Sequence, residues 1–158
     1  MTTQIKRKTM SSLGAVCLCL FASMAWADDV DDVLAFIDRY AALEGDLEKQ
    51  ASMIRDDRVM IAGSARQTDQ AENMAVQMAQ RDANQALFDG AAKWLLRTES
   101  PEVRVYGDTA VASYVRLTNI FPPGAAPINN PPLWVTLVLV KERGNWGIAH
   151  THISPIGN

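Results

Sequence analysis

The fold is decided by the stretch Glu102-Val103-Arg104-Val105-Tyr106-Gly107-Asp108-Thr109-Ala110-Val111-Ala112. On both sides of Gly107-Asp108, residues alternate in polarity with the period of a half-buried β-strand. Two alternating runs that are joined by a short glycine turn predict a β-hairpin. The second strand of this hairpin is predicted to continue to Thr118.

Further strands are predicted on both sides of the hairpin. A short one is predicted before it, at 58–62. The segment 121–132 is rich in proline, which lacks the amide hydrogen that a central strand must donate, so it is predicted to be a long loop. The apolar segment 133–140 then predicts a strand, a polar turn follows at 141–145, and the segment 146–154 predicts the last strand.

The first part of the chain has the period of α-helices. Apolar residues between Val30 and Ala41 recur every three or four positions. Gly45-Asp46 suits the end of this first helix and the N-cap of a second one. A third helix is predicted to be capped at 68–69 and to end near Gly90.

Helices that precede a set of antiparallel strands are typical of an α+β domain. We therefore predict one such domain, with its N-terminal helices packed on one face of a curved antiparallel sheet. Met74 and Met78 of the third helix are expected to fill irregular gaps in the core between the two layers.

The segment 1–27 has the organisation of a cleavable export signal. A basic start at 6–8 is followed by an apolar run at 13–22, and Ala25-Trp26-Ala27 places small residues where a signal peptidase reads them. The apolar run is well below the ~20 residues that cross a bilayer, and an uncleaved N-terminal anchor is the alternative. We predict that the mature domain is 28–158, periplasmic or secreted, with no stable membrane insertion after cleavage.

Cleavage of this signal leaves an acidic domain without cysteine. The whole chain has 15 basic and 18 acidic side chains, and the segment 1–27 contains three of the basic ones, so 12 face 18 in the mature domain. Nucleic acid is not expected as a partner, because phosphate binding relies on clustered Lys and Arg. Cys17 and Cys19 both lie in the signal, so neither a disulfide nor thiol chemistry is expected.

The sequence lacks the motifs of several enzyme classes. It has no Gly-x-Ser-x-Gly elbow, no phosphate-binding glycine loop, no His-Glu-x-x-His and no Cys-x-x-Cys. Hydrolases with a serine elbow, nucleotide enzymes, zinc proteases and thiol oxidoreductases are therefore disfavoured.

Four pieces of the mature domain occur together in a specific order. They are Gly45-Asp46-Leu47, the Asp56-Asp57 pair that leads into Val59-Met60-Ile61, the hairpin 105–112 and the ending 146–154. In this order they resemble the SnoaL-like branch of the nuclear transport factor 2-like superfamily. The resemblance implies a cone-shaped curved antiparallel sheet closed by helices, a pocket inside the cone, and homodimers packed through the sheet. It implies no single function, because the fold hosts isomerases, cyclases, dehydratases, hydrolases and binding or assembly domains.

The last predicted strand contains the only two histidines of the chain. Trp146, Ile148, His150, His152 and Ser154 are spaced by two, so an unbroken strand presents all five side chains on one face. The two apolar members are expected to face the core, and the other three are therefore expected to line the pocket. There the histidines are either hydrogen-bonded structural residues, ligand-binding residues or acid–base groups.

Four aromatic residues are further candidates for binding a ligand: Tyr40, Trp94, Tyr114 and Trp134. Arg116 alternates with apolar neighbours and is either a pocket cation or a solvated residue of the sheet, with the second favoured. Neither a metal nor a cofactor is predicted. A His-x-His pair needs at least a third metal ligand, and no cysteine is left after cleavage.

The predicted function is the binding of a small, largely apolar molecule by an exported homodimer. The apolar strand 133–140 supports the dimer, because it offers more hydrophobic surface than one small core hides. One alternative is an acid–base enzyme of the isomerase or lyase type that uses His150 or His152. The paired carboxylates of the steroid isomerases and the Asp-Arg-Asp set of the epoxide hydrolases cannot be placed in this sequence. The other alternative is a non-catalytic assembly module.

Overall fold

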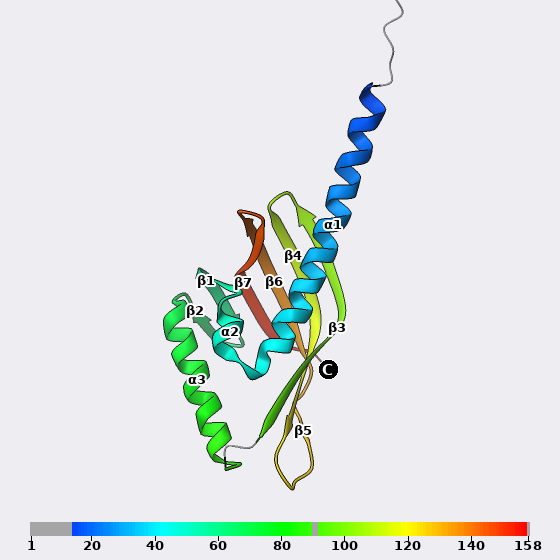
Figure 1. Cartoon of the computed structure of the whole chain (residues 1–158). Helices are drawn as coiled ribbons and strands as arrows, with labels where there is room; N and C mark the ends of the chain where they lie inside the picture. Colours follow the sequence, from blue (N-terminus) through cyan, green and yellow to red (C-terminus); the bar gives the residue numbers. More distant parts are fainter. Residues whose placement is uncertain (1–13, 90–91, 158) are drawn as a thin grey trace, which may run out of the picture.

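The structure, a computed structural model, describes residues 14–89 and 92–157 (Figure 1). Its longest helix, α1 (Gly14–Ala42), contains the helix predicted at 30–41 and extends back through the predicted cleavage site. The basic start of the signal, at 6–8, lies outside the described residues. In the described part of the chain, no helix is long and apolar enough to cross a membrane.

The remaining helical elements are η1 (Leu43–Gly45), α2 (Leu47–Ala51) and α3 (Gln70–Ala86). The carboxylate of Asp46 caps α2 by accepting a hydrogen bond from the Lys49 N–H at 3.1 Å. Asp69 caps α3 in the same way, with the Glu72 N–H at 2.9 Å. Both caps were predicted, because an aspartate at this position satisfies a free amide of the first turn. The third helix ends at Ala86, before the predicted end near Gly90, and Gly90 itself lies outside the described residues.

The described strands form one sheet of seven in the order β2-β1-β7-β6-β4-β3, with β5 beside β4. They are β1 (Ile54–Ala62), β2 (Ala65–Gln67), β3 (Lys93–Tyr106), β4 (Thr109–Phe121), β5 (Ile128–Asn129), β6 (Leu133–Glu142) and β7 (Asn145–Pro155). The predicted α+β fold, with N-terminal helices on one face of a curved sheet, is confirmed. The sheet is not antiparallel throughout, because β1 and β7 run parallel. These two strands are far apart in the sequence, so no tight turn imposes the antiparallel direction on them.

The hairpin predicted around Gly107 is present. Val105 pairs with Ala110 across the turn, and Gly107 has a φ of +62°, which glycine adopts without strain. β3 begins earlier than the predicted strand. An irregularity between Glu99 and Glu102 interrupts the alternation on which that prediction relied.

The proline-rich segment 121–132 is a loop, as predicted, except for Phe121, which ends β4, and the two-residue strand β5. Ile128 pairs with Ile120, so this loop folds back on the end of β4. In Figure 1 it extends beyond the rest of the sheet at the lower end of the molecule.

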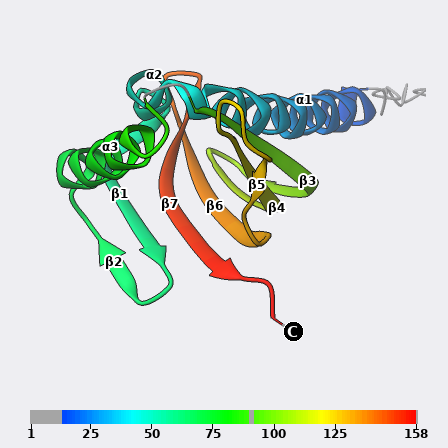
Figure 2. The same ribbon diagram turned by 90° about the horizontal axis from the view of Figure 1, so that it is seen from below.

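The sheet has an inner face toward the helices and an outer face away from them (Figure 2). Alternate residues of the central strands, such as Ala112, Leu137 and Leu139, define the inner face and are at most 1% exposed. Val33 and Ile37 of α1 belong to the same hydrophobic cluster. The part of the inner face that lies under α1 is therefore a close-packed hydrophobic core.

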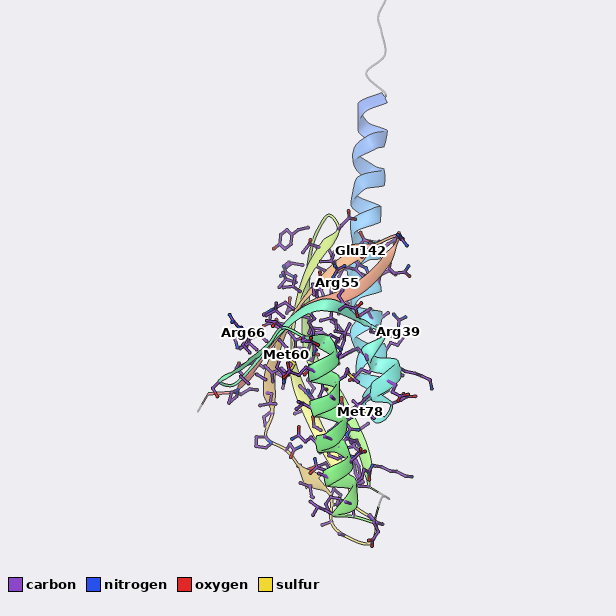
Figure 3. The ribbon with its side chains drawn as sticks, turned by 90° about the vertical axis from the view of Figure 1, so that its left-hand side faces the viewer. Arg39, Arg55, Met60, Arg66, Met78 and Glu142 are labelled. Carbon is purple, nitrogen blue, oxygen red and sulfur yellow. The ribbon has the colours of Figure 1, made fainter. Side chains whose placement is uncertain are left out.

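The first part of α3 packs near β1 with a mainly polar side. Its buried residues are Gln70 and Asn73. Met74 and Met78, which were expected to fill the core, are only half-buried and lie outside the hydrophobic cluster. Figure 3 shows Met60 of β1 beside the first turns of α3. The interior is thus hydrophobic under α1 and polar under α3.

Candidate functional site

The last strand contains a β-bulge that the sequence pattern does not reveal. Ile148 of β7 pairs with Leu139 of β6, whereas the next pair joins His150 to Val138. Ala149 is therefore an extra residue on β7. A bulge of this kind reverses the face to which all later side chains of the strand point.

The bulge moves both histidines to the outer face. Beyond it Thr151, which is 4% exposed, points inward, and the two histidines pair with residues of β6 and β1 that point outward. His152 is exposed and His150 is half-buried. The prediction that His150 and His152 line the interior is therefore wrong, because it assumed an unbroken alternation along the strand. Their part in binding a ligand stays a prediction.

Ser154 and Trp134 also lie on the outer face, where they are paired on β7 and β6. Trp134 is 46% exposed, and Ser154 is half-buried. Neither side chain points into the space between the sheet and the helices, so the structure corrects their predicted position as well.

Three other candidates, Tyr40, Trp94 and Tyr114, do lie on the inner side. Tyr114 is 2% exposed on β4, and Tyr40 of α1 packs against the hydrophobic cluster. Trp94 of β3 is half-buried and pairs with Ile120. Their contact with a ligand stays a prediction.

A buried carboxylate ties the helices to the sheet. Glu44 of η1 is 7% exposed. Its Oε1 accepts hydrogen bonds from Arg81 Nη2 at 2.9 Å and from Arg116 Nη2 at 3.4 Å, and its Oε2 accepts one from Gln50 Nε2 at 3.2 Å. Arg81 Nη1 also donates to the backbone carbonyl of Glu44 at 2.8 Å. These charge-assisted bonds connect η1 with α2, α3 and β4.

Arg116 and Arg81 bring positive charge to the inner side. Arg116 follows Tyr114 on the inner face of β4, and its Nε donates to Thr118 Oγ1 at 3.2 Å. The favoured prediction of a solvated Arg116 is therefore corrected, because the register of β4 points it toward Glu44. The guanidinium carbon of Arg81 lies 4.3 Å from the centre of the Trp94 ring, which is a cation–π distance.

Arg58 of β1 is a third guanidinium on the inner side, and it is only 3% exposed. Within residues 14–89 and 92–157 it forms no ion pair, and its Nη2 is buried without a hydrogen-bond partner. Burial lowers the pKa of Arg58, and the nearby Tyr40 opposes this change. The ordinary pKa of arginine is so high that the group still carries its charge at neutral pH.

More polar atoms without partners lie near Arg58. Gln67 of β2 and Thr151 of β7 both pair with Met60, so they share its row on the inner face, and α3 packs against β1 beside them. Besides Arg58 Nη2, the buried atoms without a partner on this side of the described chain are Gln67 Oε1, Gln70 Nε2, Asn73 Oδ1 and Thr151 Oγ1, and those elsewhere are Trp94 Nε1, Asn119 Oδ1 and Trp146 Nε1. Because buried polar groups are nearly always hydrogen-bonded, such a group of atoms is expected where water or a ligand binds.

The buried tyrosines of the inner side are neutral hydrogen-bonding groups. Burial is the main cause that raises the pKa of both Tyr40 and Tyr114 above the ordinary phenol value. Arg58 and Arg116 oppose this rise at Tyr40, whereas Glu44 adds to it. The charges of all three side chains therefore act on one phenol.

This arrangement is suited to hold a polar molecule. It combines guanidiniums, phenols, amides and a hydroxyl, and its one carboxylate is engaged in ion pairs. No group of three His, Cys, Asp or Glu residues that could hold a metal ion is found among the described residues. A separate surface cleft of about 490 Å³ lies between α1, α2 and the start of β7, near Arg39 and Lys49, and includes none of these polar residues.

Sequence reasoning missed Glu44, Arg58 and Arg81. Arg58 has a signal, because it alternates with Met60 and Ala62 as a single charge on an otherwise apolar face. Arg81 ends a stripe at helical spacing that indicates a polar buried side, and its members are Gln70, Asn73, Gln77 and Arg81. Glu44 has no comparable signal, since a short 3-10 turn has no sequence period.

Two solved structures of other proteins have the same fold. A nuclear transport factor 2-like protein with a cystatin-like fold from Novosphingobium aromaticivorans is 18% identical with a TM-score of 0.72, and the match covers 88% of this chain and 89% of that chain. A protein from Catenulispora acidiphila in complex with S-DNPA is 14% identical with a TM-score of 0.68, and the match covers 80% of this chain and 92% of that chain.

A third solved structure has a similar fold, and one family model matches the sequence. The CamKII hub homology domain from Chlamydomonas reinhardtii is 26% identical with a TM-score of 0.60, and the match covers 82% of this chain and 99% of that chain. A search of curated proteins finds no match. The model of the SnoaL-like domain matches residues 33–157, which is most of the chain. The chain therefore belongs to the SnoaL-like domain family.

Proposed function

We propose that the mature domain 28–158 acts outside the cytoplasm as a homodimer and binds a small molecule between the inner face of the sheet and the helices. The observation that supports binding most directly is the group of buried polar atoms without partners near Arg58. Leaving such an atom unsatisfied costs about 1–3 kcal/mol, and a bound ligand removes this cost.

The proposed ligand has a polar part and an apolar part. Tyr114 and Trp94 offer aromatic surface, whereas Arg58, Asn73 and Thr151 offer hydrogen-bonding groups. This changes the expectation of a largely apolar ligand, because the polar side of α3 was not anticipated from the sequence. The Catenulispora acidiphila protein, which has the same fold and was solved with S-DNPA, supports ligand binding within this fold.

Chemical-shift mapping tests this proposal. Isotope-labelled 28–158 is titrated with a mixture of small aromatic and aliphatic acids, amides and alcohols. At least one compound is expected to shift the amide signals of Thr151, Asn73 and Tyr114 more than that of His152. Thr151→Phe fills the space and should weaken binding about tenfold or more. His152→Phe, on the opposite face of the same strand, is the matched control. Shifts confined to the outer face or to the cleft near Arg39 would contradict interior binding.

Several features support the exported homodimer. Asp29, the second residue of the proposed mature chain, forms an ion pair with Lys141 of β6. The proposed mature N-terminus is therefore attached to the sheet from its second residue. The outer face carries exposed apolar side chains, with Val111 at 37%, Leu95 at 44% and Trp134 at 46%. Exposed apolar groups that gather on one face are typical of an interaction surface. The family resemblance implies the same mode of association, through the sheet.

The native mass of the exported protein tests cleavage and association together. Its expected value is twice the mass of the chain 28–158. Trp134→Glu puts a charge on the outer face and should give the mass of one chain, because an unpaired charge is costly to bury. Leu87→Glu, at a position that is 74% exposed near the end of α3, should leave the dimer intact. A product that keeps 1–27 would contradict cleavage, and a strict monomer would contradict the homodimer.

An assembly module is the second candidate, and the 26% identity to the CamKII hub homology domain favours it. A native mass above that of a dimer, without any interior binding, would support this candidate over the first. Acid–base catalysis by His150 or His152 is not proposed, because both side chains are on the face opposite the polar interior.

A further inference from the structure

We infer that the ligand carries an anionic group, in the first place a carboxylate, and that this group binds the guanidinium of Arg58. The inference rests on the proposed function, because it names the chemical class of the molecule that the interior binds.

The interior has more positive charge than its own acid neutralises. Arg81 and Arg116 both pair with Glu44, at 2.9 and 3.4 Å. The second oxygen of this carboxylate accepts a hydrogen bond from Gln50. Glu44 is thus fully engaged, and Arg58 is left without a counter-ion among the described residues.

Another arginine of the same strand shows the contrast. Arg55, whose side chain is 24% exposed, pairs with Asp57 at 2.8 Å and with Glu142 at 2.5 Å, and Figure 3 shows Arg55 close to Glu142. Arg58 is more deeply buried, and no carboxylate of the described residues pairs with it. Because a buried charge without a partner strongly destabilises a folded protein, its presence here indicates a counter-ion that the described residues do not supply. Departures of this kind from the rules of stable packing are expected at functional sites.

The groups around Arg58 suit a carboxylate. A guanidinium presents its N–H groups as a planar fork that matches the two oxygens of a carboxylate. Thr151, Gln70 and Asn73 each have a buried polar atom without a partner, and an amide offers a donor or an acceptor according to how it is turned. The phenol of Tyr40 lies near enough to Arg58 to influence the pKa of the guanidinium. An anion in this space therefore meets several donors.

A single carboxylate on the ligand also matches the single guanidinium of Arg58, which does not pair with Glu44. Arg81 is occupied by Glu44 and by the ring of Trp94, and Arg116 is occupied by Glu44 and Thr118. One guanidinium without a counter-ion matches a single negative charge better than the higher charge of a phosphate monoester.

Matched pairs of carboxylic acids and their primary amides test the inference. The two members of a pair have nearly the same shape and differ in charge. By calorimetry, wild-type protein should bind the acids at least about tenfold more tightly than the amides. Arg58→Met should abolish this preference, whereas Arg66→Met, at an exposed position of β2, should keep it.

The melting temperature without ligand separates a binding arginine from a structural one. Arg58→Met removes an unpaired charge and should raise the melting temperature, whereas loss of a structural arginine would lower it. If the methionine variant does not fold, Arg58→Lys keeps the charge without the fork and should reduce the preference for acids without removing it.

The other possible results of the binding experiments distinguish a failure of this inference from a failure of the proposed function. Equal binding of acids and amides in the interior would overturn the inference and leave the proposed function intact. Absence of interior binding by either series would overturn both. Inorganic phosphate is the probe for the other anion. Phosphate could raise the melting temperature of wild-type protein but not of Arg58→Met, while no preference for acids is seen. This result would overturn the carboxylate and indicate that the anionic group bound by Arg58 is a phosphate.

Discussion

Replacing Glu44 with alanine is expected to lower the free energy of unfolding by about 3–5 kcal/mol. Glu44 is 7% exposed, and the side chains of its partners Arg81 and Arg116 are 16% and 26% exposed. Without the carboxylate, both guanidiniums stay largely removed from water but lose their counter-charge. Water still reaches part of each arginine, so the loss is expected near the lower value.

Urea denaturation followed by tryptophan fluorescence measures this loss. Glu48→Ala, at an exposed position of α2, is the control and should change the free energy of unfolding by no more than about 0.5 kcal/mol. The loss of unfolding free energy in Glu44→Gln should lie between the losses in these two alanine variants, because the amide oxygen of the glutamine still accepts a hydrogen bond from an arginine. If Glu44→Ala cost no more than the control, the ion pairs would not contribute to holding η1, α3 and β4 together.

Replacing Ile148 with alanine is expected to cost about 2–4 kcal/mol of unfolding free energy, whereas His152→Ala should change it by no more than about 0.5 kcal/mol. Ile148 is fully buried and pairs with Leu139 on the inner face. His152 lies beyond the bulge at Ala149 and is exposed on the outer face. The two substitutions therefore remove a core side chain and a surface side chain from the same strand.

Denaturation curves of these two variants decide whether the bulge exists in solution. An unbroken strand would place both side chains on the inner face, since they are four residues apart. Both substitutions would then destabilise the protein to a similar extent. Equal losses would contradict the bulge, and a large loss for Ile148 alone would support it.

The parts of the fold that could be predicted depend on neighbours in the sequence. The hairpin at 105–112 follows from local alternation and one glycine turn, and Asp46 and Asp69 cap helices through amides three residues away. The parallel pairing of β1 with β7 could not be predicted in this way, because the two strands meet only after the whole sheet has formed.

The candidate site was predicted only in part, for a related reason. Tyr40, Trp94 and Tyr114 were placed among the pocket candidates and do lie on the inner side. His150 and His152 were placed on the wrong face, because one extra residue in the pairing with β6 reverses every later side chain. No residue between 146 and 154 identifies that extra position, since the bulge belongs to the pair of strands and not to one of them.

By itself the sequence determined the order of the longer helices and strands, the positions of the two helix caps, the hairpin and the resemblance to the SnoaL-like family, because these depend on residues that are close along the chain. It did not predict the short strands β2 and β5. Only the tertiary structure decided which charges meet. Glu44 is 37 residues from Arg81 and 72 from Arg116, and no local pattern joins them. The same packing leaves Arg58 buried without a counter-ion among residues 14–89 and 92–157, because burial and ion pairing are properties of the assembled layers and not of any one segment.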